Sequence, residues 1–230
     1  MSGMFLNLAL QVPGMETVDL TAGEWMVRIW EDGGFMMWPL AAALALGIII
    51  IVWKLIGLSI ISSRTKKVLR AVDERLAARD INGAMEAARE SDTPAAKILR
   101  AGLERHGEGS ERVMKAIENV GMIQMAGLES GLVWLATIAN VAPLLGFLGT
   151  VIGMIQAFAN IQAAGEVDAT IVAGGIQVAL ITTATGLAIA IPINIMHNYF
   201  VTKVDRLVID MEESAQKMID TLQEMEASAA

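Results

Sequence analysis

The 230-residue sequence contains no cysteine and only two histidines, His106 and His197. Without thiols the chain can form neither a disulfide, nor a thiolate metal site, nor a cysteine nucleophile. The two histidines are far apart in the sequence and neither has a second plausible ligand beside it, so we expect no metal site and no cofactor. No nucleophile–base constellation is visible either, which argues against an enzyme of the soluble type.

Positive charge is scarce as well: Lys and Arg number 17 against 25 Asp and Glu, for a net charge of -8. There is no basic stripe of the kind that nucleic acid requires, so nucleic acid is excluded as a partner. Hydrophobic residues make up 54% of the chain, which is too many for an ordinary soluble domain. They are concentrated in three blocks, and this pattern indicates a membrane protein.

Each apolar block exceeds the roughly 20 residues that a helix needs to cross a bilayer. The blocks are residues 35–61, 131–161 and 171–201, and the second and third contain no Asp, Glu, Lys or Arg. The predicted fold class is therefore an all-α membrane protein with three transmembrane helices in contact with the lipid bilayer.

The first block holds a single charge, Lys54, directly after Trp53. Trp38 and Trp53 flank the span as interfacial aromatic residues do. We expect Lys54 to extend its ammonium to the lipid headgroups at the end of the span. A functional buried lysine is the alternative.

Basic residues predict the orientation of the spans. Those that follow the first span within residues 62–79 are Arg64, Lys66, Lys67, Arg70, Arg75 and Arg79. Arg28 is the only basic residue before the first span, and the loop between the second and third spans has none. Because basic loops stay in the cytoplasm, the N-terminus is expected outside and the C-terminus inside. The predicted segments outside the membrane are 1–34 and 162–170 on the outer side, and 62–130 and 202–230 in the cytoplasm.

The N-terminus does not have the pattern of a cleaved signal peptide. Met1–Pro13 lacks a positive n-region, and its apolar run is short and interrupted by polar residues. We expect this segment to be retained, as an interfacial helix.

The cytoplasmic segments have helical patterns. Asp92-Thr93-Pro94 predicts an N-cap and a first-turn proline for a helix over Ala95–Arg105. Ser110 can cap the next helix. No strong breaker follows between Glu111 and Pro143, so we expect one helix to run from the cytoplasm into the second span.

An apolar stripe marks the acidic helix predicted after the third span. Its members recur at spacings of three and four, and they are Val204, Leu207, Val208, Met211, Ala215, Met218 and Leu222. Such a stripe must be covered. Packing within the chain against residues 111–130 and contact between subunits of a ring both remain open.

Small residues form a stripe in each of the last two spans. At spacings of three and four, small residues let membrane helices approach closely. The second span has Ala142, Gly146, Thr150 and Gly153, with Gly149 beside them, and the third has Gly175, Ala179, Thr182, Thr183, Gly186 and Ala190. Helix packing is the simplest interpretation of each glycine.

The main polar side chains deep in these spans, with Thr137 and Thr185 nearby, are predicted to line an ion pathway. They are Asn140, Thr150, Thr182 and Thr183. Pro143 and Pro192 each remove one helix hydrogen bond and so free the carbonyls of Ala139 and Ala188. Hydroxyls and free carbonyls are suitable partners for a small cation or a water chain. The alternative is that each threonine only bonds to its own helix.

The second and third spans lack a carboxylate, and this limits what the chain can do alone. Most proton-coupled machines need a group in the membrane that changes charge. Either the polar groups are structural, or another chain supplies the acid.

Several segments resemble the MotA/TolQ/ExbB proton channel family. They are APLLGFLGTVIGMIQAF (Ala142–Phe158), GGIQVALITTATGLAIAIP (Gly174–Pro192), the following Asn198-Tyr199, and GGFMMWPL before the first span. Three spans with a cytoplasmic domain after the first are similar to the ExbB or TolQ type and unlike the four-span flagellar MotA type.

The resemblance implies a homopentamer in a bacterial inner membrane, around a dimer of a single-span ExbD/TolR-like partner that carries a membrane aspartate. Thr150 and Thr183 match the threonines that face this aspartate in the family. The implied function is an ion-conducting subunit of a motor that serves a TonB-like energy transducer. Val178 stands where many members have glutamate, and the Thr182-Thr183 pair resembles sodium-driven stators. Both H⁺ and Na⁺ therefore remain open as coupling ions.

Three other functions are alternatives to this one. A flagellar- or gliding-type stator subunit would use the same residues in a different machine. A non-conducting membrane scaffold would use the small residues for assembly alone. A secondary transporter is disfavoured, because three spans are few and no inverted repeat is visible.

Overall fold

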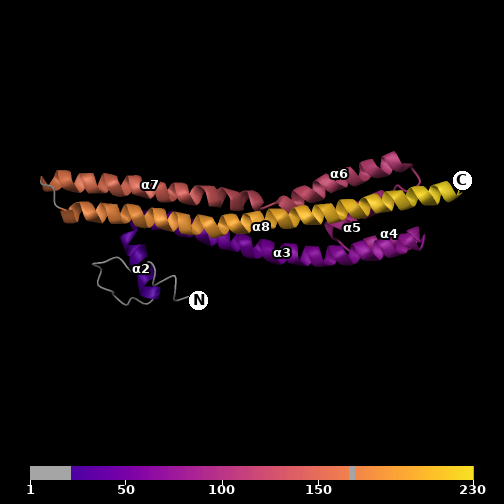
Figure 1. Ribbon diagram of the computed structural model, residues 1–230, viewed down its shortest axis with the longest axis horizontal. Helices are drawn as coiled ribbons and strands as arrows, with labels where there is room; N and C mark the ends of the chain where they lie inside the picture. The colour runs from indigo at the N-terminus through magenta and orange to yellow at the C-terminus, as the bar shows by residue number, and fades with distance from the viewer. Residues whose placement is uncertain (1–21, 166–168, 230) are drawn as a thin grey trace. The chain divides into compact units, whose positions relative to one another are not determined.

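The computed structural model describes residues 22–165 and 169–229, and every regular element among them is a helix (Figure 1). The predicted all-α class is confirmed. Three helical stretches are long and apolar enough to cross a membrane, judged by length and composition, and they are Gly34–Ala77, Ser110–Ala164 and Val172–Met225.

The helices extend well beyond the apolar blocks. In chain order they are α2 (Ala22–Asp32), the 3-10 helix η1 (Gly34–Met36), α3 (Met37–Ala77), α4 (Ile81–Arg89), α5 (Pro94–Leu103), α6 (Ser110–Glu129), α7 (Leu132–Ala164) and α8 (Ala169–Ala229). The predicted loop 162–170 is shorter than expected, because α7 continues to Ala164 and α8 begins at Ala169. Glu166 and Asp168 lie outside the described residues, as does Met1–Pro13.

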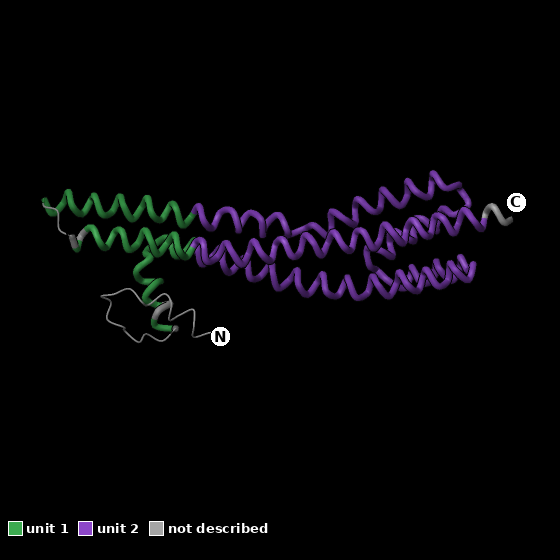
Figure 2. Tube along the Cα trace, in the orientation of Figure 1, with its two compact units in different colours: residues 1–39, 145–185 green, residues 40–144, 186–230 purple. Residues whose placement is uncertain are grey.

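The chain divides into two compact units, which Figure 2 shows in different colours. Unit 1 contains residues 1–39 and 145–185, and unit 2 contains residues 40–144 and 186–230. Helices α3, α7 and α8 each contribute residues to both.

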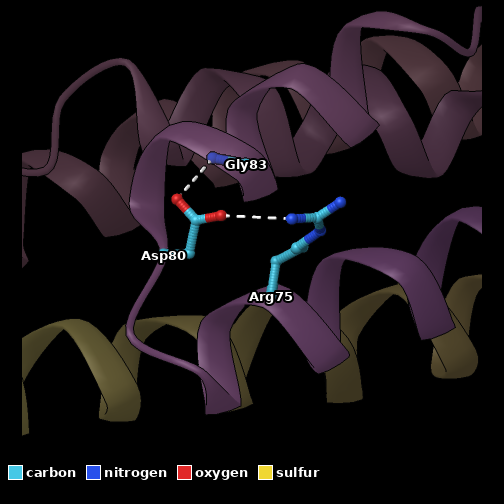
Figure 3. Close-up of polar contacts among 3 residues, drawn as sticks. All are labelled: Arg75, Asp80 and Gly83. Atoms are coloured by element: carbon cyan, nitrogen blue, oxygen red, sulfur yellow. Dashed lines mark hydrogen bonds and ion pairs between the residues drawn. The ribbon is translucent and has the colours of Figure 1, made fainter.

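In unit 2, the turn between α3 and α4 is held by its own polar groups. Arg79 has φ +59, and its N–H donates to the Leu76 carbonyl while the Asp80 N–H donates to the Arg75 carbonyl, which is a Schellman end for α3. Asp80 then caps α4: Oδ1 accepts from the Gly83 N–H at 2.8 Å, and Oδ2 lies 3.3 Å from Arg75 Nη1 (Figure 3). One carboxylate therefore serves both helices.

The predicted start of α5 is confirmed. Thr93 Oγ1 accepts from the Ala96 N–H at 3.3 Å, and Pro94 occupies the first turn. The predicted cap of α6 is wrong. The N-cap is Gly109, with φ +89 and no side-chain cap bond, and Ser110 is already helical. Only glycine adopts that backbone conformation at low cost.

The prediction of one helix from Glu111 into the second span is also wrong. The helix is interrupted between α6 and α7, where Ser130 has an extended backbone with ψ 135° and Gly131 has φ +84°. The Ser130 hydroxyl donates to the Gly127 carbonyl at 2.7 Å, so the serine satisfies one of the carbonyls that the end of α6 leaves free.

Lys54 satisfies a second carbonyl at this break. Its Nζ donates to the Leu128 carbonyl at 2.7 Å and lies 5.7 Å from the centre of the Trp53 ring. Lys54 is only 6% exposed, so the expectation that its ammonium extends to the headgroups is wrong within this chain. The free carbonyls and negative dipole end of α6 provide the partner that a buried ammonium needs.

The apolar stripe of α8 forms the core of unit 2. Its buried members are Val204, Leu207, Met211, Ala215, Met218 and Leu222. Gly102 of α5 lies so close to Met218 and to Ile117 of α6 that a Cβ there would overlap both side chains. Packing within the chain is therefore confirmed for this stripe, and additional contact between subunits of a ring stays a prediction.

Candidate functional site

In unit 1, α7 and α8 meet at a seam of small residues. A Cβ added to Gly149 would overlap the Thr182 side chain, and one added to Gly153 would lie 2.8 Å from the Gly175 carbonyl oxygen. A Cβ on Gly175 would in turn lie 2.7 Å from the Gly153 carbonyl oxygen. The two backbones approach as closely as glycine permits, which is the arrangement that small-residue stripes favour in membranes.

A hydrogen bond joins the two helices at the end of this seam. Thr183 Oγ1 of α8 donates to the Gly146 carbonyl of α7 at 3.3 Å. The Thr183 side chain is half-buried, and Gly146 is buried. This is the bond by which a predicted site residue contacts the opposite helix of the pair.

Thr182 has a different environment from its neighbour. Its hydroxyl donates within α8 to the carbonyls of Val178 and Ala179, both at 3.0 Å. The residue is fully buried and lies against Gly149. Thr182 is therefore a packing residue of the seam in this chain, and its oxygen is closed off from any open surface.

Thr150 lies on the same side of α7 as Gly146. Its hydroxyl donates to the Phe147 carbonyl at 2.7 Å, and the residue is half-buried. Gly146 and Thr150 are four residues apart, which is about 6 Å along a helix. The structure thus brings Thr150 and Thr183 to one stretch of the seam. Each hydroxyl uses its hydrogen for a carbonyl, so its oxygen lone pairs remain available to a cation or a water molecule.

The remaining predicted site residues belong to unit 2. Pro143 and Pro192 lie inside continuous helices α7 and α8. Gly186 is buried, and Asn140 is exposed in the single chain.

One polar contact of unit 1 escaped the sequence analysis. Gln177 Nε2 of α8 donates to Asp32 Oδ2 of α2 at 2.8 Å, and Asp32 Oδ2 lies 4.0 Å from Arg28 Nε. The only signal was an amide side chain within an uncharged apolar block. Its partner could not be found from sequence, because the two residues are 145 positions apart.

Within 22–165 and 169–229, no three His, Asp or Glu side chains gather in a way that could hold a metal ion. The polar groups at the seam are hydroxyl and carbonyl oxygens that lie in uncharged apolar blocks.

Apolar helices of membrane-spanning length, joined through a seam of glycine and threonine, define a multi-pass membrane protein. The chain belongs to the MotA/TolQ/ExbB proton channel family, whose model matches residues 90–213, more than half of the sequence. The match covers α5, α6, α7 and most of α8, including the whole seam. The resemblance found in the sequence is confirmed.

Several relatives are similar to the chain. A biopolymer transport protein ExbB homologue of Methanothermobacter thermautotrophicus is 34% identical over 197 residues, which cover 84% of this chain and 68% of the relative. ExbB of Neisseria meningitidis is 31% identical over 187 residues, covering 74% of this chain and 84% of the relative. ExbB of Xanthomonas campestris is 41% identical over 100 residues, covering 44% and 39%.

Proposed function

We propose that this chain is the ion-conducting subunit of an inner-membrane motor complex that couples the ion-motive force to the work of a TonB/Tol-like system. The observation that carries the proposal is the pair of half-buried hydroxyls, Thr150 and Thr183, beside the α7–α8 seam. Both lie in helices without charged residues in their apolar blocks. Their oxygens can accept a hydrogen bond or contact a cation while their hydrogens stay bonded to carbonyls.

The acid that the pathway needs would come from another chain. The apolar blocks 131–161 and 171–201 offer no carboxylate, and hydroxyls do not change charge near neutral pH. An ExbD/TolR-like dimer with one span and a membrane aspartate would supply it. An ion that binds and leaves this aspartate would change its charge, and Thr150 and Thr183 would hydrogen-bond one charge state better than the other. This difference would drive motion of one component against the other.

A homopentameric ring would surround this partner. Support comes from apolar side chains that lie outside the apolar blocks and are uncovered in the single chain. On α6 they include Met122 and Ile123, which are 62% and 67% exposed. Exposure of such an apolar surface to water is unfavourable, and neighbouring copies of the chain would cover it. From the basic residues after the first span, the N-terminus is proposed to be periplasmic and the C-terminus cytoplasmic.

The test is the replacement of each hydroxyl by a methyl group of the same shape. Thr183→Val or Thr150→Val is expected to abolish energy transduction in the complete complex while membrane assembly stays intact. Thr185→Val is the matched control, because its hydroxyl also donates to a carbonyl, that of Ile181 at 2.8 Å, within α8 alone. Wild-type activity in both pathway variants would contradict conduction and favour the scaffold.

The coupling ion requires its own experiment. Energy transduction should be measured with Na⁺ removed at a constant proton-motive force. Full activity without Na⁺ would exclude obligatory Na⁺ coupling, and loss of activity that returns on adding Na⁺ would exclude coupling to H⁺ alone.

The scaffold remains the second candidate function because of one observation. Thr182 is fully buried against Gly149, so at least one of the polar residues in the stripe serves helix packing. If all the seam residues serve helix packing alone, variants such as Thr150→Val and Thr183→Val, which keep the side-chain shape, should keep energy transduction.

A further inference from the structure

Two adjoining hollows lie between α3 and α8 in unit 2. The first, of about 340 Å³, is mostly apolar and has Leu58, Tyr199 and Phe200 among its lining residues. The second, of about 270 Å³, is lined about equally by polar and apolar surface, and Lys66 and Arg206 are among its residues. Lys203 lines both, so the two hollows adjoin at this side chain, and together they are called the groove, with an apolar end and a cationic end.

The cationic end carries unmatched positive charge. Lys66, Lys203 and Arg206 form no ion pair within the described parts of the chain, whose ion pairs involve other cations. Asp210 is the one acidic residue that lines this hollow. Three cations against one carboxylate leave a surplus of two positive charges in a chain whose net charge is -8. An anion would complement this surplus.

The groove lies where two apolar blocks end. Its apolar end is formed by the last residues of blocks 35–61 and 171–201, and its cations come directly after them in both helices. Tyr199 lies at the transition and is about half exposed, as an amphipathic side chain at a membrane boundary commonly is. One ligand must therefore offer an apolar body and an anionic head side by side.

We propose that this groove binds one anionic phospholipid of the bilayer. An acyl chain would lie against the exposed side chains of Leu55 and Tyr199, and the headgroup phosphate would be bound by Lys203, Arg206 and Lys66. Lys and Arg near a membrane surface attract anionic lipids by about 1 kcal/mol each, and a groove that contacts an acyl chain adds apolar burial that free phosphate lacks. The site does not depend on ion conduction, because it uses none of the seam residues.

The test compares two variants with the same change of charge. In K66Q/K203Q/R206Q all three groove cations are neutralised, and in R64Q/K67Q/R70Q three exposed cations of α3 outside the groove are neutralised. The full chain is purified in a neutral detergent and given phosphatidylglycerol or phosphatidylcholine. Bound lipid is then counted by native mass spectrometry, and thermal unfolding is followed in parallel.

The wild type and the control are expected to retain phosphatidylglycerol in preference to phosphatidylcholine. The groove variant should bind it at least about tenfold more weakly. An equal loss of bound phosphatidylglycerol in the two variants would show a general attraction to anionic lipid and would overturn the site. Equal retention of phosphatidylglycerol and phosphatidylcholine by the wild type would also overturn it. Stabilisation by inorganic phosphate that equals the stabilisation by the lipid would identify a free anion as the ligand and also overturn the proposal.

A second variant keeps the test decisive if the triple variant fails to fold. Ser59→Trp places a bulky ring in the apolar end from an exposed position and leaves all three cations in place. Retention of phosphatidylglycerol should fall about as much as in the triple variant. Unchanged retention would mean that no acyl chain occupies the groove.

Discussion

The Lys54 ammonium donates a 2.7 Å hydrogen bond to the carbonyl of Leu128, and so joins the first apolar helix to the end of α6. A continuous helix would offer that carbonyl the Leu132 N–H, but the break at Gly131 removes this donor. A buried charge and an unpaired carbonyl, each costly alone, satisfy one another.

Replacing Lys54 therefore tests the role of this bond. Lys54→Met keeps the length and apolar stem but leaves the Leu128 carbonyl without a donor, and we expect a loss of about 1–2 kcal/mol of stability. Lys54→Arg keeps a donor and is the control, with a smaller loss. Unfolding by denaturant in detergent measures both. A Met variant as stable as the wild type would mean that removing the buried charge offsets the lost bond.

Gly131 tests the break itself. Its φ of +84 disfavours any residue with a Cβ, and a Cβ there would lie 3.3 Å from the Trp53 ring. Gly131→Ala is expected to lower stability by about 1–2 kcal/mol. Gly127→Ala, only four residues earlier, meets no atom within 4 Å and should raise helix stability by about 0.5–1 kcal/mol. Changes of the same sign in both variants would contradict a fixed break.

Asp73 of α3 gives a pH-dependent prediction. The residue lies beyond the end of block 35–61, where burial raises the pKa of its carboxyl, Lys217 of α8 lowers it and Glu213 raises it further. A raised pKa means that the folded chain disfavours the carboxylate, so this group's contribution to stability falls as pH rises from the ordinary aspartate pKa to the raised one. Asp73→Asn should therefore be more stable than the wild type at neutral pH.

The advantage of Asp73→Asn should vanish below about pH 3.9, where the carboxyl is protonated in both states. Melting temperatures of both proteins across this range provide the measurement. Asp210→Asn makes the same carboxylate-to-amide change at another position, in α8, and serves as the control. A difference between Asp73→Asn and the wild type that does not change with pH would contradict the proposed cause.

The all-α class could be predicted from the sequence, because long apolar stretches with almost no charge have few alternatives to a membrane helix. It did not reveal the break at Ser130-Gly131, because both residues are also tolerated inside helices and only the turn's backbone shows otherwise. The burial of Lys54 was equally hidden, since its partner lies 74 residues away.

Within the candidate site, sequence could name the threonines but could not sort them. Thr182 and Thr183 are neighbours of the same type, and one residue along a helix turns a side chain by about 100°. That rotation directs Thr182 towards Gly149 and lets Thr183 reach the Gly146 carbonyl. Only the relative rotation of α7 and α8 distinguishes the packing hydroxyl from the one that bonds across the seam.

Gly149 offers the sharpest test of the seam. Gly149→Ala would force a Cβ into the Thr182 side chain, so α7 and α8 must separate or their side chains must shift, at a cost of about 1–3 kcal/mol. Gly174→Ala is the matched control, because Gly174 is helical in the same unit and a Cβ there meets nothing within 4 Å. Stability of the detergent-solubilised chain and energy transduction of the complex should both fall in the Gly149 variant and stay near wild type in the control.

A Gly149→Ala chain with unchanged stability would mean that the helices do not pack as closely in the membrane. Retained stability with lost transduction would instead place Gly149 beside the moving parts of the pathway.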